Sequence, residues 1–389
     1  AYWMEAGRHA LDTYAYQQSA RHYERALALT DQPAAQMEAY LGLARAFILL
    51  DDHQAAAAVV RQGLGLAHQH GDDAHRARLL YAQAQNARRQ HRSDGGKPEV
   101  EAALGAAEEE GDQVYLAQSL LLLTEVHESS GDLGKALETA TRAQVVSSGL
   151  RDSQLEARAL VEKGFLHALR AEFDEAVHAA ERGLALLAET DDHNTIAYAW
   201  NILGRALGGR GDYGRAFAAF HRSQQEAQMI GDRYLLAQVF NMQGWLHREL
   251  GDHEGGLRFD EEGVDVAKRW GKPSPEVSAR LNLCLDVMHL GDPERALDML
   301  ERHTAKAPLF AWGKHRWFEG LIPIFYLYEQ RGNAGVLRLG QRLMDQGFDW
   351  RELMRGAEIE KPTPIREKGW RQWRHVVNLA MAIKAYGLV

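Results

Sequence analysis

The chain has 389 residues, more than a single hydrophobic core usually supports, so it either divides into domains or is built by repetition. Its net charge of -9 argues against a nucleic-acid-binding protein, which needs a basic face, and no apolar run approaches the roughly 20 residues of a membrane helix. The one cysteine, Cys284, excludes an intrachain disulfide and a zinc cluster and fits a reducing, cytoplasmic environment.

A turn signal recurs along the chain at intervals of 40 residues. Gly-Asp pairs begin at Gly131, Gly211, Gly251 and Gly291, and Asp51 and Ala171 occupy the same position in two other repeats. A second series of aspartates lies half a repeat away, at Asp72, Asp112, Asp152, Asp192 and Asp232. Glycine readily adopts the left-handed conformation that ends a helix, and the aspartate after it can cap the next helix. Each repeat therefore contains two turns and two segments.

The segments between these turns have the pattern of amphipathic helices. Apolar residues follow a three-four spacing, as in Trp200, Leu203 and Leu207. In chain order we expect about nine helical hairpins, at residues 1–30, 37–70, 76–110, 114–149, 154–189, 194–230, 234–270, 274–307 and 314–346. The predicted fold is an all-α solenoid over 1–346, followed over 347–389 by an irregular segment and one C-terminal capping helix.

Small residues recur every 40 positions inside the first helix of each hairpin. They are Ala44, Ala84, Thr124, Gly164, Gly204, Gly244 and Cys284. Glycine destabilises a helix interior by roughly 0.5–1 kcal/mol relative to alanine, so its presence here indicates that the paired helices cross closely. Cys284 is accordingly predicted to be a small core residue rather than a nucleophile.

The repeat resembles the tetratricopeptide family. The segment WNILGRALGGRGDYGRAFAAFHRS carries that family's signature at Trp200, Leu203, Gly204, Leu207, Gly211, Tyr213, Ala216, Phe220 and Ser223. It departs from the family in its period, which is 40 residues instead of the usual 34. The resemblance implies a right-handed superhelix of helical hairpins whose first helices line a concave groove.

Repeats of this length resemble two groups within that family. One is the sensor array of bacterial signal-transducing ATPases of the STAND class, including maltose-activator-like regulators. The other is the animal adaptors exemplified by kinesin light chain. The resemblance implies a protein- or peptide-binding sensor of a larger signalling protein, with a stand-alone scaffold adaptor as the alternative. The chain begins with Ala1 instead of methionine, which fits a piece of a longer protein.

Signatures of catalysis are not found in the sequence. It contains no HExxH, CxxC or GxSxG motif, and GDLGKA lacks the spacing of a phosphate-binding loop. His68, His70 and His75 lie near Asp72, but this segment is one of the repeated turns, so a solvated turn is favoured over a metal site. We expect no enzymatic activity, cofactor or metal, although an enzyme with a dispersed site in the groove stays an alternative.

Function is therefore expected in the groove. Two columns of first-helix side chains and their neighbours are predicted to bind a partner: Tyr81, Gln85, Arg158, Phe165, Tyr198, Asn201, Arg205, Gln238, Asn241, Trp245 and Arg248. Asn201 and Asn241 are the most informative, because an amide can pair with both the N–H and the C=O of a bound peptide. The alternative is that each is an ordinary polar residue on an exposed helix face.

Tryptophan is concentrated near the C-terminus. Five of the nine tryptophans lie there, at Trp312, Trp317, Trp350, Trp370 and Trp373. The favoured interpretation is a module that caps the open end of the solenoid, which repeat arrays need. The alternative is an aromatic docking surface.

Overall fold

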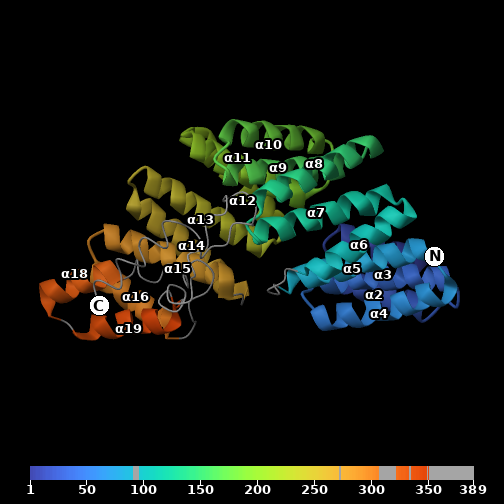
Figure 1. Ribbon diagram of the computed structural model, residues 1–389, viewed down its shortest axis with the longest axis horizontal. Helices are drawn as coiled ribbons and strands as arrows, with labels where there is room; N and C mark the ends of the chain where they lie inside the picture. Colours follow the sequence, from blue (N-terminus) through green and yellow to red (C-terminus); the bar gives the residue numbers. More distant parts are fainter. Residues whose placement is uncertain (91–95, 271–272, 306–320, 333, 348, 350–389) are drawn as a thin grey trace, which may run out of the picture. The chain divides into compact units, whose positions relative to one another are not determined.

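The computed structural model describes residues 1–90, 96–270, 273–305, 321–332, 334–347 and 349. These residues form α-helices joined by short turns, and the described part of the chain contains no β-strand, which confirms the predicted all-α class (Figure 1). The chain divides into two compact units, Ala1–Arg210 and Gly211–Val389. The predicted C-terminal helix and the five C-terminal tryptophans lie outside the described residues, so the capping module stays a prediction.

The helices follow the predicted hairpins within a few residues. Unit 1 contains α1 (Tyr2–Asp12), α2 (Tyr16–Leu27), α3 (Pro33–Leu49), α4 (His53–His70), α5 (Asp73–Arg89), α6 (Lys97–Glu110), α7 (Gln113–Ser129), α8 (Leu133–Leu150), α9 (Ser153–Leu169), α10 (Phe173–Leu187) and α11 (His193–Arg210). Unit 2 contains α12 (Tyr213–Ile230), α13 (Arg233–Glu249), α14 (His253–Trp270), α15 (Pro273–His289), α16 (Pro293–Thr304), α18 (Leu321–Arg331) and α19 (Ala334–Gln346).

From α1 to α11 and from α12 to α16, each helix packs against the next helix along the chain, and α19 packs against both α16 and α18. In unit 1 the first helices of successive hairpins also contact one another, so that α3 packs on α5, α5 on α7, α7 on α9 and α9 on α11. In unit 2 the same contact joins α13 to α15. Within each unit, the first helices therefore form a layer of their own.

The turns have the geometry that the Gly-Asp signal predicts. Gly131, Gly211, Gly251 and Gly291 have φ angles of 80°, 90°, 74° and 88°, and Asp51 and Ala171 adopt the same left-handed conformation at 58° and 59°. The aspartates of the second series each accept a hydrogen bond from the backbone N–H three residues later, at 2.9–3.2 Å: Asp72, Asp112, Asp152, Asp192 and Asp232. At these turns one helix ends and the next begins within three or four residues, except at Asp192, where α10 ends at Leu187 and α11 begins at His193.

The close helix crossing is confirmed at the small-residue positions. Ala44 and Ala84 are fully buried, and a Cβ atom added to Gly164 would lie 3.2 Å from the carbonyl oxygen of Ala176 in the paired helix α10. Cys284 is partly buried, and burial raises the pKa of its thiol to about 11. The thiol is therefore protonated near neutral pH, as expected of a packing residue, because a nucleophilic cysteine needs its thiolate.

Replacing Gly164 by leucine should destabilise unit 1. The new side chain would meet the backbone of α10 and the Ile202 methyl group at 3.4 Å, and overpacking of this kind costs about 1–3 kcal/mol. The matched control is Gly105→Leu inside α6, where an added Cβ has no atom within 4 Å. That change should leave stability unchanged or raise it by up to about 1 kcal/mol. Urea unfolding followed by circular dichroism measures both, and equal midpoints would contradict the close crossing.

Candidate functional site

The layer of first helices in unit 1 collects seven of the predicted binding residues. Tyr81 and Gln85 lie on α5, Arg158 and Phe165 on α9, and Tyr198, Asn201 and Arg205 on α11. The helix α7 lies between α5 and α9 and packs on both, so these side chains belong to one continuous layer of packed helices. We call this surface the unit 1 inner face.

Aromatic rings connect neighbouring helices along this face. The rings of Tyr81 and Tyr115 meet edge to face at 5.3 Å, and those of Phe165 and Tyr198 lie 6.4 Å apart. Gln85 donates a hydrogen bond to the Tyr81 hydroxyl at 3.0 Å. Burial raises the pKa of Tyr81, Tyr115 and Tyr198, so their hydroxyl groups are neutral hydrogen-bonding groups. The face therefore offers apolar ring surface with polar edges.

Asn201 and Arg205 form the most unusual pair on this face. They are separated by one helical turn, so their side chains are neighbours on α11. Asn201 is fully buried, yet neither its Nδ2 nor its Oδ1 has a hydrogen-bond partner in the protein. The Arg205 guanidinium lies 5.1 Å from the centre of the Phe165 ring, and it forms no ion pair with the described residues. Burial lowers the pKa of Arg205, which shows that its charge is poorly solvated.

Carboxylates gather between α7 and α9. Glu125 accepts a hydrogen bond from Arg88 Nε at 3.2 Å, and Glu128 lies one turn further along α7. The pKa of Glu162 on α9 is raised to about 8, mainly by burial and also by repulsion from Glu125, and Arg158 only partly offsets these effects. Burial also raises the pKa of Glu128. The acid groups here are thus crowded and incompletely neutralised.

Glu162 is a residue that the sequence analysis missed. It lies on α9, and burial together with the carboxylates of α7 raises its pKa. In the sequence it falls between the predicted binding residues Arg158 and Phe165. A signal was present, because the equivalent positions 40 residues away carry buried apolar residues. These are Ala82, Leu122 and Ile202. An acidic residue at a position that is otherwise apolar identifies a site that packing alone does not explain.

The four predicted residues of unit 2 lie together on α13. Gln238 and Trp245 are partly buried, and the Trp245 indole Nε1 donates a hydrogen bond to Glu249 at 2.9 Å. Asn241 accepts a hydrogen bond from the Asn282 side chain of α15, so unlike Asn201 it has a partner within the protein. Asn201 and Asn241 belong to different units, and a groove that contains both stays a prediction.

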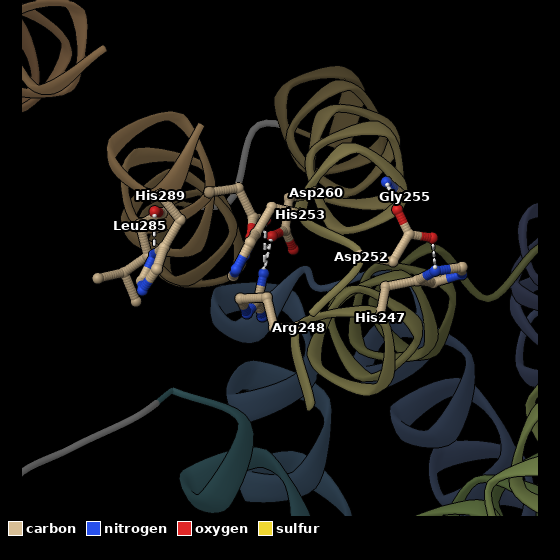
Figure 2. A network of polar contacts seen from close by, with 9 residues as sticks. His247, Arg248, Asp252, His253, Gly255, Asp260, Leu285 and His289 are labelled. Carbon is tan, nitrogen blue, oxygen red and sulfur yellow. Dashed lines mark hydrogen bonds and ion pairs between the residues drawn. The ribbon is translucent and has the colours of Figure 1, made fainter. Parts of the chain in front are cut away.

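Arg248 participates in a buried ionic network (Figure 2). Its Nη1 donates hydrogen bonds to Asp260 of α14 and, at 2.8 Å, to Asp286 of α15, and both carboxylates have no exposed surface. Gly244 and Gly256 make room for them, because a Cβ atom at either position would lie 2.8 Å from a carboxylate oxygen. The Arg248 side chain thus joins three helices of unit 2, and the binding role predicted for it stays a prediction.

Histidines surround this network. His253 Nδ1 lies 3.5 Å from Asp286 Oδ1, and the His253 ring stacks on His289 with a centroid distance of 4.4 Å (Figure 2). Desolvation by burial raises the pKa of Asp260 to about 8. The sequence carried a signal here too, because the positions equivalent to Asp260 are buried and apolar: Val60, Val100, Ala140, Ala180 and Phe220.

The remaining sequence features add no further site among the described residues. Over that part of the chain, no group of three or more histidine, cysteine or acidic side chains is arranged to hold a metal ion. His75 instead contacts the capping Asp72 at 2.8 Å. No described helix combines the length and the apolar character that crossing a membrane requires.

Solved structures share this fold. No protein-family model matches the sequence, and a search of curated proteins found no match. A Rap protein in complex with competence and sporulation factor is 14% identical with a TM-score of 0.59, over 91% of this chain and 96% of that one. NprR in complex with its cognate peptide NprX is 15% identical with a TM-score of 0.56, over 88% and 96%.

A third similar structure belongs to the ATPase group that the sequence resembles. It is a signal transduction ATPase with numerous domains from Pyrococcus horikoshii, which has a tetratricopeptide repeat sensor. It is 13% identical with a TM-score of 0.53, and the match covers 74% of this chain but only 44% of that protein. The fold prediction is confirmed: the chain is a tetratricopeptide-like helical repeat array.

The Asp260 carboxyl should make the stability of unit 2 depend on pH. Its pKa is raised from 3.8 to about 8 in the folded protein, so the folded state binds a proton that the unfolded state has released. The contribution of the protonated Asp260 carboxyl to the free energy of unfolding is fully present below about pH 4 and is lost as the pH rises through about 8. The melting temperature of the wild type should therefore fall between about pH 4 and about pH 8, and Asp260→Asn should make this fall smaller. The control is Asp298→Asn on the exposed face of α16, and equal pH profiles for the two variants would contradict the assignment.

Proposed function

We propose that the chain binds a peptide or an extended protein segment on the unit 1 inner face, and that it is the sensor part of a larger cytoplasmic signalling protein of the STAND class. The observation that carries this proposal is the Asn201 side chain, which is fully buried without a protein partner for either amide atom. An unpaired buried amide costs about 1–3 kcal/mol. A peptide backbone can pair with both of its atoms, because each peptide unit presents one N–H and one C=O.

The surroundings of Asn201 also favour a peptide. Phe165 and Tyr198 offer ring surface for apolar side chains, and Arg205 offers an unpaired charge. Two of the similar structures are complexes with a signalling factor or a cognate peptide, and another contains a repeat array named as a sensor. These likenesses are at the level of the fold, so they support the class of ligand and leave its sequence open.

A scaffold adaptor without a switching role and an enzyme with a dispersed site are the alternative functions. The unit 1 inner face has aromatic rings, an amide, arginines and glutamates, but no nucleophile paired with a base among the residues described above. The binding function is therefore favoured over the enzymatic one. An ATPase domain in the same polypeptide would favour the sensor over the adaptor.

The test is selection of random short peptides displayed on phage, with the whole chain as bait. Peptides should be enriched over a bait-free control, and the best of them should bind the chain in a fluorescence anisotropy titration. Asn201→Leu keeps the number and branching of the side-chain heavy atoms and removes the amide, so it should weaken binding by roughly 5- to 150-fold, the equivalent of about 1–3 kcal/mol.

The same variant distinguishes a binding role from a structural role. Since Asn201 has no partner in the protein, Asn201→Leu should maintain or raise the melting temperature. The matched control is Asn241→Leu at the equivalent position of α13, where the amide is bonded to Asn282, and that change should lower the melting temperature. If Asn201→Leu destabilises the chain and leaves peptide affinity unchanged, Asn201 is a packing residue and the proposal fails.

A further inference from the structure

The unit 1 inner face carries a basic group on α11 and acidic groups on α7 and α9, and Arg205 and Glu128 attract each other electrostatically. Arg205 on α11 is half-buried and has no carboxylate partner among the described residues, while Glu128 and Glu162 lie on α7 and α9 beside Glu125. Within this acidic group, Glu125 forms an ion pair with Arg88. Arg158 lies one turn from Glu162 on α9 and offsets only part of the rise in the Glu162 pKa.

Partly buried charges without partners are unfavourable unless a ligand neutralises them. A guanidinium removed from water is stabilised by a carboxylate, and crowded carboxylates are stabilised by an ammonium or guanidinium group. Asn201 independently indicates that a ligand approaches α11, because it is fully buried, lacks a protein partner and neighbours Arg205 on the same helix. The arrangement therefore specifies the charges of the ligand as well as its backbone.

We infer that the ligand of the unit 1 inner face is a peptide with one acidic and one basic group, the acidic group binding Arg205 and the basic group binding Glu128 and Glu162. This inference rests on the proposed function and adds the chemistry of the ligand to it. The acidic group is an aspartate or glutamate side chain or a C-terminal carboxylate. The basic group is a lysine or arginine side chain or an N-terminal amine.

Helix spacing sets the distance between the two groups. Packed helices lie about 8–10 Å apart, and α11 packs directly on α9. An extended peptide advances about 3.3 Å per residue, so a strand that crosses from α11 to the far side of α9 covers about three residues. The acidic and basic groups of the ligand are therefore about three positions apart in its sequence.

Binding of the basic group is linked to release of a proton from Glu162. The ionisable groups that face Glu162 are Glu125 and Glu128 of α7, Arg158 of α9 and Tyr198 of α11. On another face of α9, Arg182 of α10 lies 3.9 Å from Glu156. The pKa of Glu162 is about 8 without ligand, and an added cation beside it lowers that pKa. The affinity for the peptide should therefore increase as the pH increases, by up to about tenfold per pH unit below about pH 8, and level off above pH 8.

The experiment compares phage selections of random short peptides on three whole-chain baits: wild type, Arg205→Gln and Glu162→Gln. Wild type should enrich peptides with an acidic and a basic residue about three positions apart. Arg205→Gln should lose the acidic preference only, and Glu162→Gln should lose the basic preference only. Glutamine has nearly the shape of a protonated glutamate, so Glu162→Gln should fold normally, which circular dichroism checks.

The best wild-type peptide then serves as the probe for proton linkage. Its affinity, measured by fluorescence anisotropy, should increase from about pH 6 to about pH 8 on wild type and stay constant on Glu162→Gln. Arg222→Gln, on an exposed face of α12, is the control and should behave like wild type. Enrichment of peptides without the charge pair, or the same preferences on all three baits, would overturn this inference and leave the proposed function intact. If no bait enriches any peptide, the proposed function fails as well.

Discussion

The close crossing of the two helices in each hairpin is the constraint on which this structure depends. It requires a small residue at one position of every first helix, from Ala44 through Gly164 to Cys284, and alanines such as Ala136 and Ala176 opposite. Because the crossing recurs every 40 residues, the first helices of each unit pack side by side with the same face in the same direction. Side chains far apart in sequence thereby become neighbours, and this is how the inner face of unit 1 is built.

The parts of the fold that depend on local chemistry were predictable from the sequence. A left-handed Gly131 and a capping Asp152 act through their own backbone and the next few residues, so their spacing alone gave the helix boundaries. Burial depends on tertiary neighbours instead. Asn201 was predicted to face a groove or solvent and is fully buried, while Glu162 and Asp260 took positions that the helix pattern assigns to apolar side chains. Such exceptions emerge when equivalent positions of the repeats are compared with one another.

One polar contact occurs in both units at equivalent positions five repeats apart. His53 Nδ1 lies 2.9 Å from the Asn86 side-chain oxygen in unit 1, and His253 Nδ1 lies 3.5 Å from Asp286 in unit 2. In both units the contact joins the start of the second helix of one hairpin to the end of the first helix of the next hairpin. Several repeats between them carry apolar pairs there, such as Leu133 with Leu166. A buried polar pair distinguishes one helix contact from the equivalent contacts in the other repeats. A shift in the pairing of the helices would leave an amide or a carboxylate unpaired. We therefore regard specifying the correct pairing of the helices as its role.

Two groups of charged side chains among the described residues differ in how their charges are satisfied. In unit 2, Arg248 lies between Asp260 and Asp286 and donates hydrogen bonds to both, and these bonds hold α13, α14 and α15 together. In unit 1, Arg205 has a ring instead of a carboxylate beside it, and Asn201 has no protein partner at all. Charges that are paired within the protein stabilise its packing. Under the proposed function, the unpaired Arg205 charge and Asn201 amide acquire their partners from a ligand, and this difference would separate binding residues from structural ones.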